Sequence, residues 1–210
     1  MTQPTFLYDD ACPMCRVYTG AFKRCGWSDR TPFSAIDEEI LPRIDLDRGR
    51  HEIPLVDVRS GEVLYGLDAM TTVLSRAMPR LRPIFRSPVL LAILKPLYWL
   101  ITYNRRIIAG TRAPENGYDC APDVHRGWRL MWIALAIIFA TLLGIPGGWT
   151  LFGVFFIGAW LISRADRLDS LGHLATTILL ASCLSSWMPG KVTILVFWAV
   201  LVGELWRRLG

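Results

Sequence analysis

Residues 5–15 read Thr-Phe-Leu-Tyr-Asp-Asp-Ala-Cys-Pro-Met-Cys, an apolar run that leads directly into two cysteines separated by two residues. The first four residues have the composition of a buried strand. Proline is favoured at the first position of a helix, so we expect Cys12 at the N-cap and Pro13 at the helix start. Apolar residues then recur at helical spacing as far as Gly26. The predicted order is strand, cysteine pair, helix.

This order predicts different roles for the two cysteines. A thiolate at a helix N-terminus meets unpaired backbone N–H groups and the positive end of the helix dipole, so its pKa falls. Cys12 is therefore the expected nucleophile. Cys15, one helical turn further on, is placed to attack a mixed disulfide at Cys12 and release the reduced partner. Carboxylates oppose the ionisation of a nearby thiol, so Asp9 is predicted instead to pass protons to and from Cys15.

The C-terminal part of the chain has a different composition. Residues 130–206 carry only seven Asp, Glu, Lys, Arg or His side chains. They contain four apolar runs, each close to the shortest length of a membrane-spanning helix: 130–146, 149–163, 171–188 and 192–206. We expect an α/β domain at residues 1–124 and an all-α transmembrane domain, with four helices, at residues 125–210.

The distribution of basic residues predicts the orientation of these spans. If the N-terminal domain is cytoplasmic, the inside loops hold six arginines and the outside loops hold only Lys191, as the positive-inside rule requires. The six are Arg126, Arg129, Arg164, Arg167, Arg207 and Arg208. The expectation is an integral protein of the inner or plasma membrane type, with its redox domain and C-terminus in the cytoplasm. Five sparse cysteines and no secretory signal at residues 1–10 argue against a disulfide-stapled secreted fold.

A basic segment lies between the two expected domains. Residues 76–112 carry eight positive and no negative side chains, interleaved with aromatic residues. Such a segment binds either nucleic acid or an anionic lipid surface. Because it runs toward the apolar tail, we expect membrane lipid as its partner and no nucleic acid. The alternative is that its apolar residues pack onto the domain's own sheet.

Further strands and a helix are expected before this segment. Residues 51–58 and 63–65 read as two strands joined by a tight turn. Pro54 lies at the start of the first of these strands. A helix is expected at residues 69–78, with Asp68 at its N-cap.

These motifs resemble the DCC family of thiol-disulfide oxidoreductase-like proteins, whose Asp-x-x-Cys-x-x-Cys motif corresponds to residues 9–15. The similarity continues through residues 61–69 and 98–106, and covers about the first 120 residues. It implies a thioredoxin-like fold and a protein-disulfide reductase or thiol-disulfide oxidoreductase activity, carried by Cys12 and Cys15. The expected partner is a protein or a small disulfide or thiol.

A second resemblance concerns substrate binding. Ile53-Pro54 and Gly66-x-Asp68 are similar to the cis-proline and Gly-x-Asp elements with which glutaredoxins help bind glutathione. This resemblance implies that Ile53, Pro54 and Asp68 bind substrate and that glutathione is a candidate partner.

Metal binding is the main alternative for the cysteine pair. Structural zinc usually requires a second cysteine pair or paired histidines, and the remaining candidates are isolated in the sequence: Cys25, His51, Cys120 and His125. Two thiolates suffice for Cu(I). The alternative function is therefore a soft-metal binding module that delivers Cu(I) to the membrane domain, although the tail has no Met- or Cys-rich relay. The redox function needs no cofactor and no bound metal.

Overall fold

The computed structural model describes residues 3–57, 60–111, 120, 123–144, 153, 157, 167–188 and 191–209. The chain divides into two compact units. The N-terminal unit comprises Met1–Arg105 and Ala113–Asp123, and the C-terminal unit comprises Arg106–Arg112 and Val124–Gly210.

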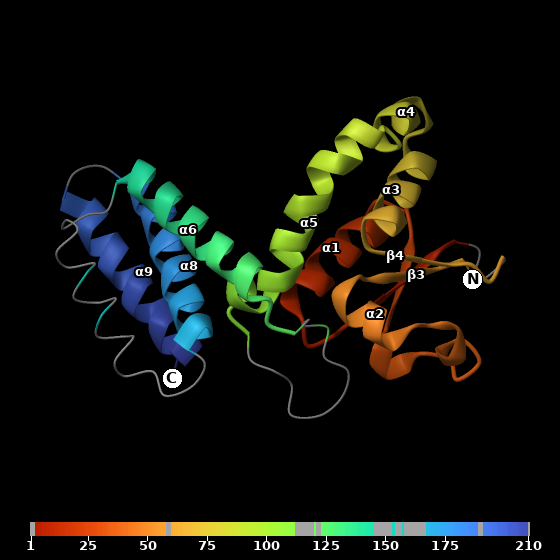
Figure 1. The fold of residues 1–210 in the computed structure, drawn as a ribbon, viewed down its shortest axis with the longest axis horizontal. Coiled ribbons are helices and arrows are strands. Elements are labelled where there is room, and N and C mark those ends of the chain that lie inside the picture. The colour runs from red at the N-terminus through yellow and green to blue at the C-terminus, as the bar shows by residue number, and fades with distance from the viewer. Residues whose placement is uncertain are drawn as a thin grey trace. The chain divides into compact units, whose positions relative to one another are not determined.

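A four-stranded mixed sheet lies at the centre of the N-terminal unit, in the order β2-β1-β3-β4 (Figure 1). Its strands are β1 (Thr5–Tyr8), β2 (Asp29–Pro32), β3 (Pro54–Val56) and β4 (Val63–Tyr65). β1 pairs with β2 in parallel, whereas the β1–β3 and β3–β4 pairs are antiparallel. The predicted strand at residues 5–8 is confirmed. β3 is shorter than predicted, because His51 ends a helix that Asp45 caps by accepting a hydrogen bond from the Arg48 N–H.

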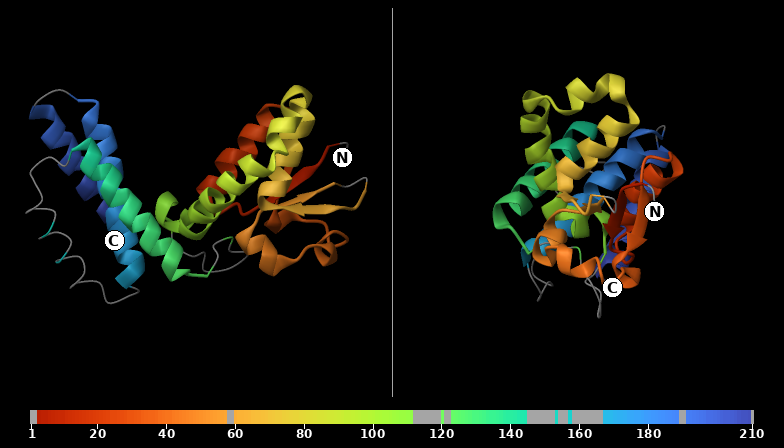
Figure 2. Two further views of the ribbon diagram at one scale, coloured as in Figure 1. Left: turned by 45° about the horizontal axis from the view of Figure 1, so that its top comes forward. Right: turned by 90° about the vertical axis from the view of Figure 1, so that its right-hand side faces the viewer.

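Successive side chains of a strand point to opposite faces of the sheet, and both faces of this sheet are buried. Phe6 packs with Phe22 of α1 (Pro13–Arg24) and Val73 of α3 (Gly66–Ala77). The next residue, Leu7, points to the other face and packs with Ile44 and Val56. α1 and α3 thus cover one face, and α2 (Leu46–His51) lies on the other (Figure 2). Burying each large side chain contributes roughly 1.5–3 kcal/mol.

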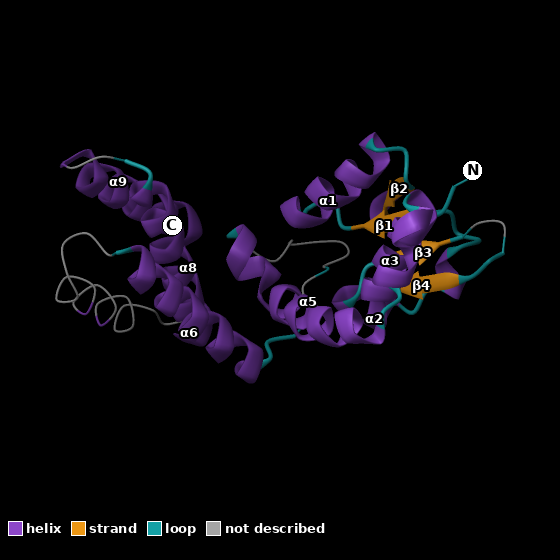
Figure 3. Cartoon of the chain, turned by 90° about the horizontal axis from the view of Figure 1, so that it is seen from above, coloured by secondary structure: helices purple, strands orange, loops and turns teal. Residues whose placement is uncertain are grey.

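Short helices connect these elements and a long one follows them. The short helices are η1 (Phe33–Ala35), η2 (Leu41–Arg43), η3 (Pro79–Leu81) and α4 (Arg82–Phe85). The long helix is α5 (Pro88–Ala109). Most of the basic segment predicted to lie on lipid therefore belongs to α4 and α5, and the stretch Pro79–Phe85 meets α5 at a bend of 72°. Figure 3 shows α5 from above.

The prediction for the start of α3 is wrong. Tyr65 is its N-cap and Asp68 lies inside its first turn, so Asp68 does not cap the helix. The reason is Gly66, whose φ of 55° lets the chain turn from β4 directly into the helix. A side chain at this position would also lie 2.9 Å from the Tyr98 hydroxyl.

The C-terminal unit consists of helices in its described part. α8 (Arg167–Ser186) packs between α6 (Arg126–Leu143) and α9 (Lys191–Leu209) (Figure 1). The contacts use small and branched residues, including Ala140, Leu174, Ala181 and Leu201, as is common between helices in lipid.

Two of the described helices, α6 and α8, are long and apolar enough to cross a membrane. A third span is added if the bent pair Pro79–Phe85 and Pro88–Ala109 counts as one. The apolar run predicted at residues 149–163 lies outside the described residues, apart from Gly153 and Ile157. The composition of these helices is compatible with a membrane protein.

Candidate active site

The cysteine pair lies at the junction of β1 and α1. Cys12 is the N-cap of α1 in an extended conformation, and Pro13 occupies the first helical turn, which confirms the predicted helix start. The Cys12 N–H donates to the Asp9 carbonyl oxygen at 3.2 Å, and its own carbonyl accepts from the Arg16 N–H at 3.1 Å. Cys15 faces the core, where its side chain is 2% exposed.

A third cysteine joins the pair. Cys120, which the sequence presents as isolated, has its Sγ 3.8 Å from the Cys15 Sγ. The sulfur atoms of Cys12, Cys15 and Cys120 all lie within 4.8 Å of one another. Cys12 and Cys120 are only 7% and 5% exposed. Within the described part of the chain, this is the one group of three side chains that could share a metal ion, and its sulfur donors would suit a soft one.

Asp9 holds the loop around the thiols. It is buried, its Oδ1 accepts from the Ala11 N–H at 2.8 Å, and its Oδ2 accepts from the Cys120 N–H at 3.1 Å. Both carboxylate oxygens are therefore occupied by backbone donors. These contacts make Asp9 a positioning residue for Cys120, and its predicted proton transfer to Cys15 stays a prediction.

Arg105 is a functional candidate that sequence reasoning missed. This buried side chain comes from α5, and its Nη1 lies 3.9 Å from the Cys15 Sγ. Its Nη2 donates to the His51 carbonyl oxygen at 3.0 Å, and its Nε donates to the Thr102 carbonyl oxygen at 3.3 Å. The sequence pointed to Arg105 only in that it lies within residues 98–106, a stretch that resembles the DCC family. Its hydrogen bonds fix a positive charge beside the thiols.

The three thiols differ in the direction in which their pKa is shifted. Hydrogen bonds from the Cys120 and Cys15 thiols lower the pKa of Cys12 far below its ordinary value, and outweigh the opposite effect of burial. The pKa of Cys15 is raised, chiefly by its hydrogen bond to Cys12, and the pKa of Cys120 is raised by its bonds to both partners. These shifts favour the thiolate at Cys12, with Cys15 and Cys120 as thiol donors to it.

A cavity of about 200 Å³ opens beside Cys15. Ile53 lines it together with Tyr98 and Arg105, so the structure brings one of the predicted substrate-binding residues to the thiols. The exposed Asp68 does not line it. Pro54 is fully buried in β3.

The expectation of a cis peptide bond before Pro54 is wrong. No peptide bond in the described residues is cis, and the trans form is the lower-energy isomer before proline. The Ile53 carbonyl oxygen also accepts a hydrogen bond from the Gly66 N–H at 3.0 Å, which fastens β3 to the start of α3.

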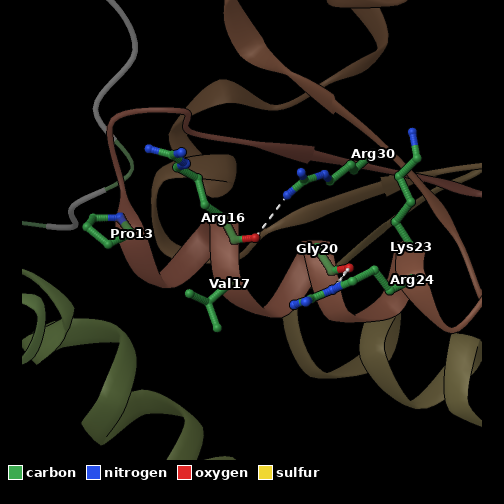
Figure 4. Close-up of a pocket in the computed structure, with 7 residues that line it drawn as sticks. All are labelled: Pro13, Arg16, Val17, Gly20, Lys23, Arg24 and Arg30. Carbon is green, nitrogen blue, oxygen red and sulfur yellow. Dashed lines mark hydrogen bonds between the residues drawn. The ribbon is translucent and has the colours of Figure 1, made fainter.

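A basic groove runs along the outer surface of α1 (Figure 4). Its volume is about 500 Å³, and its lining residues are Pro13, Arg16, Val17, Gly20, Lys23, Arg24 and Arg30. Arg30 reaches across from β2, where its Nη1 donates to the Arg16 carbonyl oxygen at 2.9 Å. The groove begins at Pro13, the residue next to Cys12, and carries four cationic side chains. Anions are the ligands that such a surface favours.

Comparisons with known proteins bear on the same residues. The family model of DCC1-like thiol-disulfide oxidoreductases matches residues 6–111. No curated protein and no solved structure matches the chain. The match spans 106 of the 210 residues and contains Asp9, Cys12, Cys15 and Arg105, whereas Cys120 lies beyond its end. The sequence-based assignment is confirmed: the chain belongs to the family of DCC1-like thiol-disulfide oxidoreductases.

Proposed function

We propose that this oxidoreductase is anchored in a membrane and exchanges its Cys12/Cys15 dithiol with a disulfide partner on the cytoplasmic side. The observation that carries the proposal is the position of Cys12 at the N-cap of α1 with the Cys15 and Cys120 sulfurs within 4.8 Å, an arrangement that lowers the pKa of Cys12. The order of β1, cysteine pair and α1 supports a thioredoxin-like fold for the N-terminal unit. The apolar α6 and α8 support the anchor, and the arginine distribution supports the orientation.

The reaction takes two exchange steps. The Cys12 thiolate attacks one sulfur of the partner's disulfide, so a Cys12–partner bond forms and the other partner sulfur leaves as a thiolate. Cys15 then loses its proton and attacks the Cys12 Sγ, which releases the second partner thiolate. The partner gains two electrons and the chain retains a Cys12–Cys15 disulfide, which an external thiol reduces in the reverse sequence. Arg105 lies where it stabilises the Cys15 thiolate.

We further propose that the partner carries negative charge near its sulfur, as glutathione or an acidic protein segment does. The basic groove next to Pro13 would bind the charge. The cavity lined by Cys15 and Ile53 would accept an apolar part of the partner.

Reversing two charges of the groove tests this choice of partner. Arg16→Glu combined with Arg24→Glu should raise the KM for glutathione about five- to tenfold, because two favourable exposed charge contacts become repulsive. The kcat should stay the same, and the difference should shrink at high salt. Arg80→Glu with Arg82→Glu changes the net charge equally at an exposed site outside the groove and is the matched control. Equal KM values for the two double variants would contradict a role for the groove.

Trapping tests the function itself. The Cys15→Ser full-length protein, expressed in its native membranes, should accumulate a mixed disulfide at Cys12, because the second step is removed. Electrophoresis without reductant should show a shifted band, and mass spectrometry should identify the partner linked to Cys12. The Cys12→Ser, Cys15→Ser double variant is the control and should trap nothing. If the single variant also traps nothing, the cysteine pair does not exchange with a disulfide partner and the proposal fails.

A further inference from the structure

Cys120 is the feature of the N-terminal unit that the two-step reaction leaves unused. Its thiol is buried and lies 3.8 Å from the Cys15 Sγ. A disulfide requires a sulfur separation of about 2.05 Å, so the two atoms need to approach by only about 1.8 Å. The Asp9 carboxylate fixes the Cys120 backbone N–H at 3.1 Å, and the same side chain holds the loop before Cys12. The third thiol is thus positioned by the active-site loop itself.

The chemistry of the cluster indicates which sulfur of the Cys12–Cys15 disulfide Cys120 attacks. In an oxidised Cys12–Cys15 pair, the preferred leaving sulfur is the one whose thiolate is better stabilised, and Cys12, at the N-cap of α1, meets the positive end of the helix dipole. Cys15 is the sulfur that Cys120 contacts directly. Arg105 lies against the same sulfur, where its positive charge favours the approach of a thiolate.

Resting on the proposed exchange at Cys12 and Cys15, we propose that Cys120 is a third redox-active thiol that takes over the disulfide bond to Cys15 from Cys12. Cys120 loses its proton to water and attacks the Cys15 Sγ. The Cys15–Cys120 bond forms, the Cys12–Cys15 bond breaks, and Cys12 leaves as a thiolate. The chain stays oxidised by two electrons throughout, so the step needs no further oxidant. Its result is a Cys15–Cys120 disulfide beside a free Cys12 thiolate, so the released partner thiol no longer meets a disulfide at Cys12 that it could attack.

Disulfide mapping of the full-length protein tests the step. The reduced protein is treated with oxidised glutathione, quenched with acid, alkylated and digested without reductant. Wild-type protein should yield two disulfide pairs: Cys12–Cys15, as a bridge within one peptide, and Cys15–Cys120, as a cross-link between two peptides in which Cys12 is alkylated. Cys120→Ser should lose the second pair and keep the first. Cys25→Ser, which removes an exposed cysteine at the end of α1, should keep both pairs.

A second variant separates the assembly of the cluster from the exchange. Cys12→Ser treated with diamide should form the Cys15–Cys120 disulfide directly, since both thiols remain in contact. If that disulfide forms but wild-type protein yields only Cys12–Cys15, the exchange onto Cys120 is overturned while the proposed function stands. If Cys12→Ser forms no Cys15–Cys120 disulfide, the inference is overturned at its geometric basis. If wild-type protein forms no internal disulfide and reduces no glutathione disulfide, the proposed function has failed.

Discussion

Replacing Cys12 by serine should lower the kcat/KM for a small disulfide substrate by a factor on the order of 10³ or more, because the variant has no nucleophile for the first step. A serine hydroxyl stays protonated at neutral pH and does not attack disulfides at a measurable rate. The steady-state rate of disulfide reduction by the full-length protein measures the loss. Cys25→Ser is the matched control, because it removes another cysteine associated with α1 and leaves the cluster intact.

The pH dependence of the wild-type protein checks the physical basis of this loss. An ordinary thiol, with a pKa of about 8.5, loses about tenfold in thiolate for each pH unit below it. The pKa of Cys12 is lowered by its neighbours, so its thiolate persists above that lowered value. The difference in thiolate absorbance near 240 nm between wild-type protein and Cys12→Ser, from which the other free cysteines largely cancel, should stay constant between about pH 6 and pH 8. A difference signal that titrates like a free thiol would contradict the stabilised thiolate.

The parts of the site that are local in sequence could be predicted. A strand, an N-cap cysteine and a proline at the helix start are set by neighbouring residues, and each prediction holds at Thr5–Tyr8, Cys12 and Pro13. The wrong prediction of an N-cap at Asp68 also concerns neighbouring residues, but the true start of α3 depends on the backbone angle of Gly66. A glycine permits a positive φ without requiring it, so the sequence alone left the turn undecided.

The two residues that complete the site are distant in sequence. Cys120 contacts Cys15 across 105 residues, and Arg105 contacts it across 90. No periodicity relates positions so far apart, because their meeting depends on how α5 and the chain after it return to α1. Cys120 counted as an isolated cysteine against a metal site, whereas the structure places it within reach of both sulfurs of the pair. Cys120 is therefore not an isolated cysteine, and its isolation no longer speaks against a metal site at the pair.

In the tail, the apolar composition predicted helices, and the described residues contain α6, α8 and α9 in three of the four predicted runs. The mean hydropathy of a long segment changes little when a single residue is replaced, so such segments are predicted well. The number of spans and their orientation depend on loop positions, and both stay predictions.

Replacing Arg105 by methionine should slow the second exchange step more than the first. Methionine keeps the length and apolar stem of the side chain but removes the charge beside the Cys15 sulfur. Cys12 and burial raise the pKa of Cys15, and the charge of Arg105 opposes them, so loss of that charge should raise the pKa of Cys15 further. A higher pKa also makes the remaining thiolate a stronger nucleophile, so the net rate should fall about three- to tenfold.

Stopped-flow mixing with oxidised glutathione distinguishes this role from a purely structural one. Arg105 also donates to the His51 carbonyl oxygen, so Arg105→Met should lower the free energy of unfolding by about 1–3 kcal/mol whatever its part in exchange. A positioning role at Cys15 adds a kinetic signature: the mixed disulfide at Cys12 accumulates, and raising the pH restores the rate of its resolution. Arg105→Lys, which keeps a positive charge, should recover part of that rate. If Arg105→Met is less stable but resolves the mixed disulfide at the wild-type rate across the pH range, Arg105 stabilises the fold and has no part in the exchange.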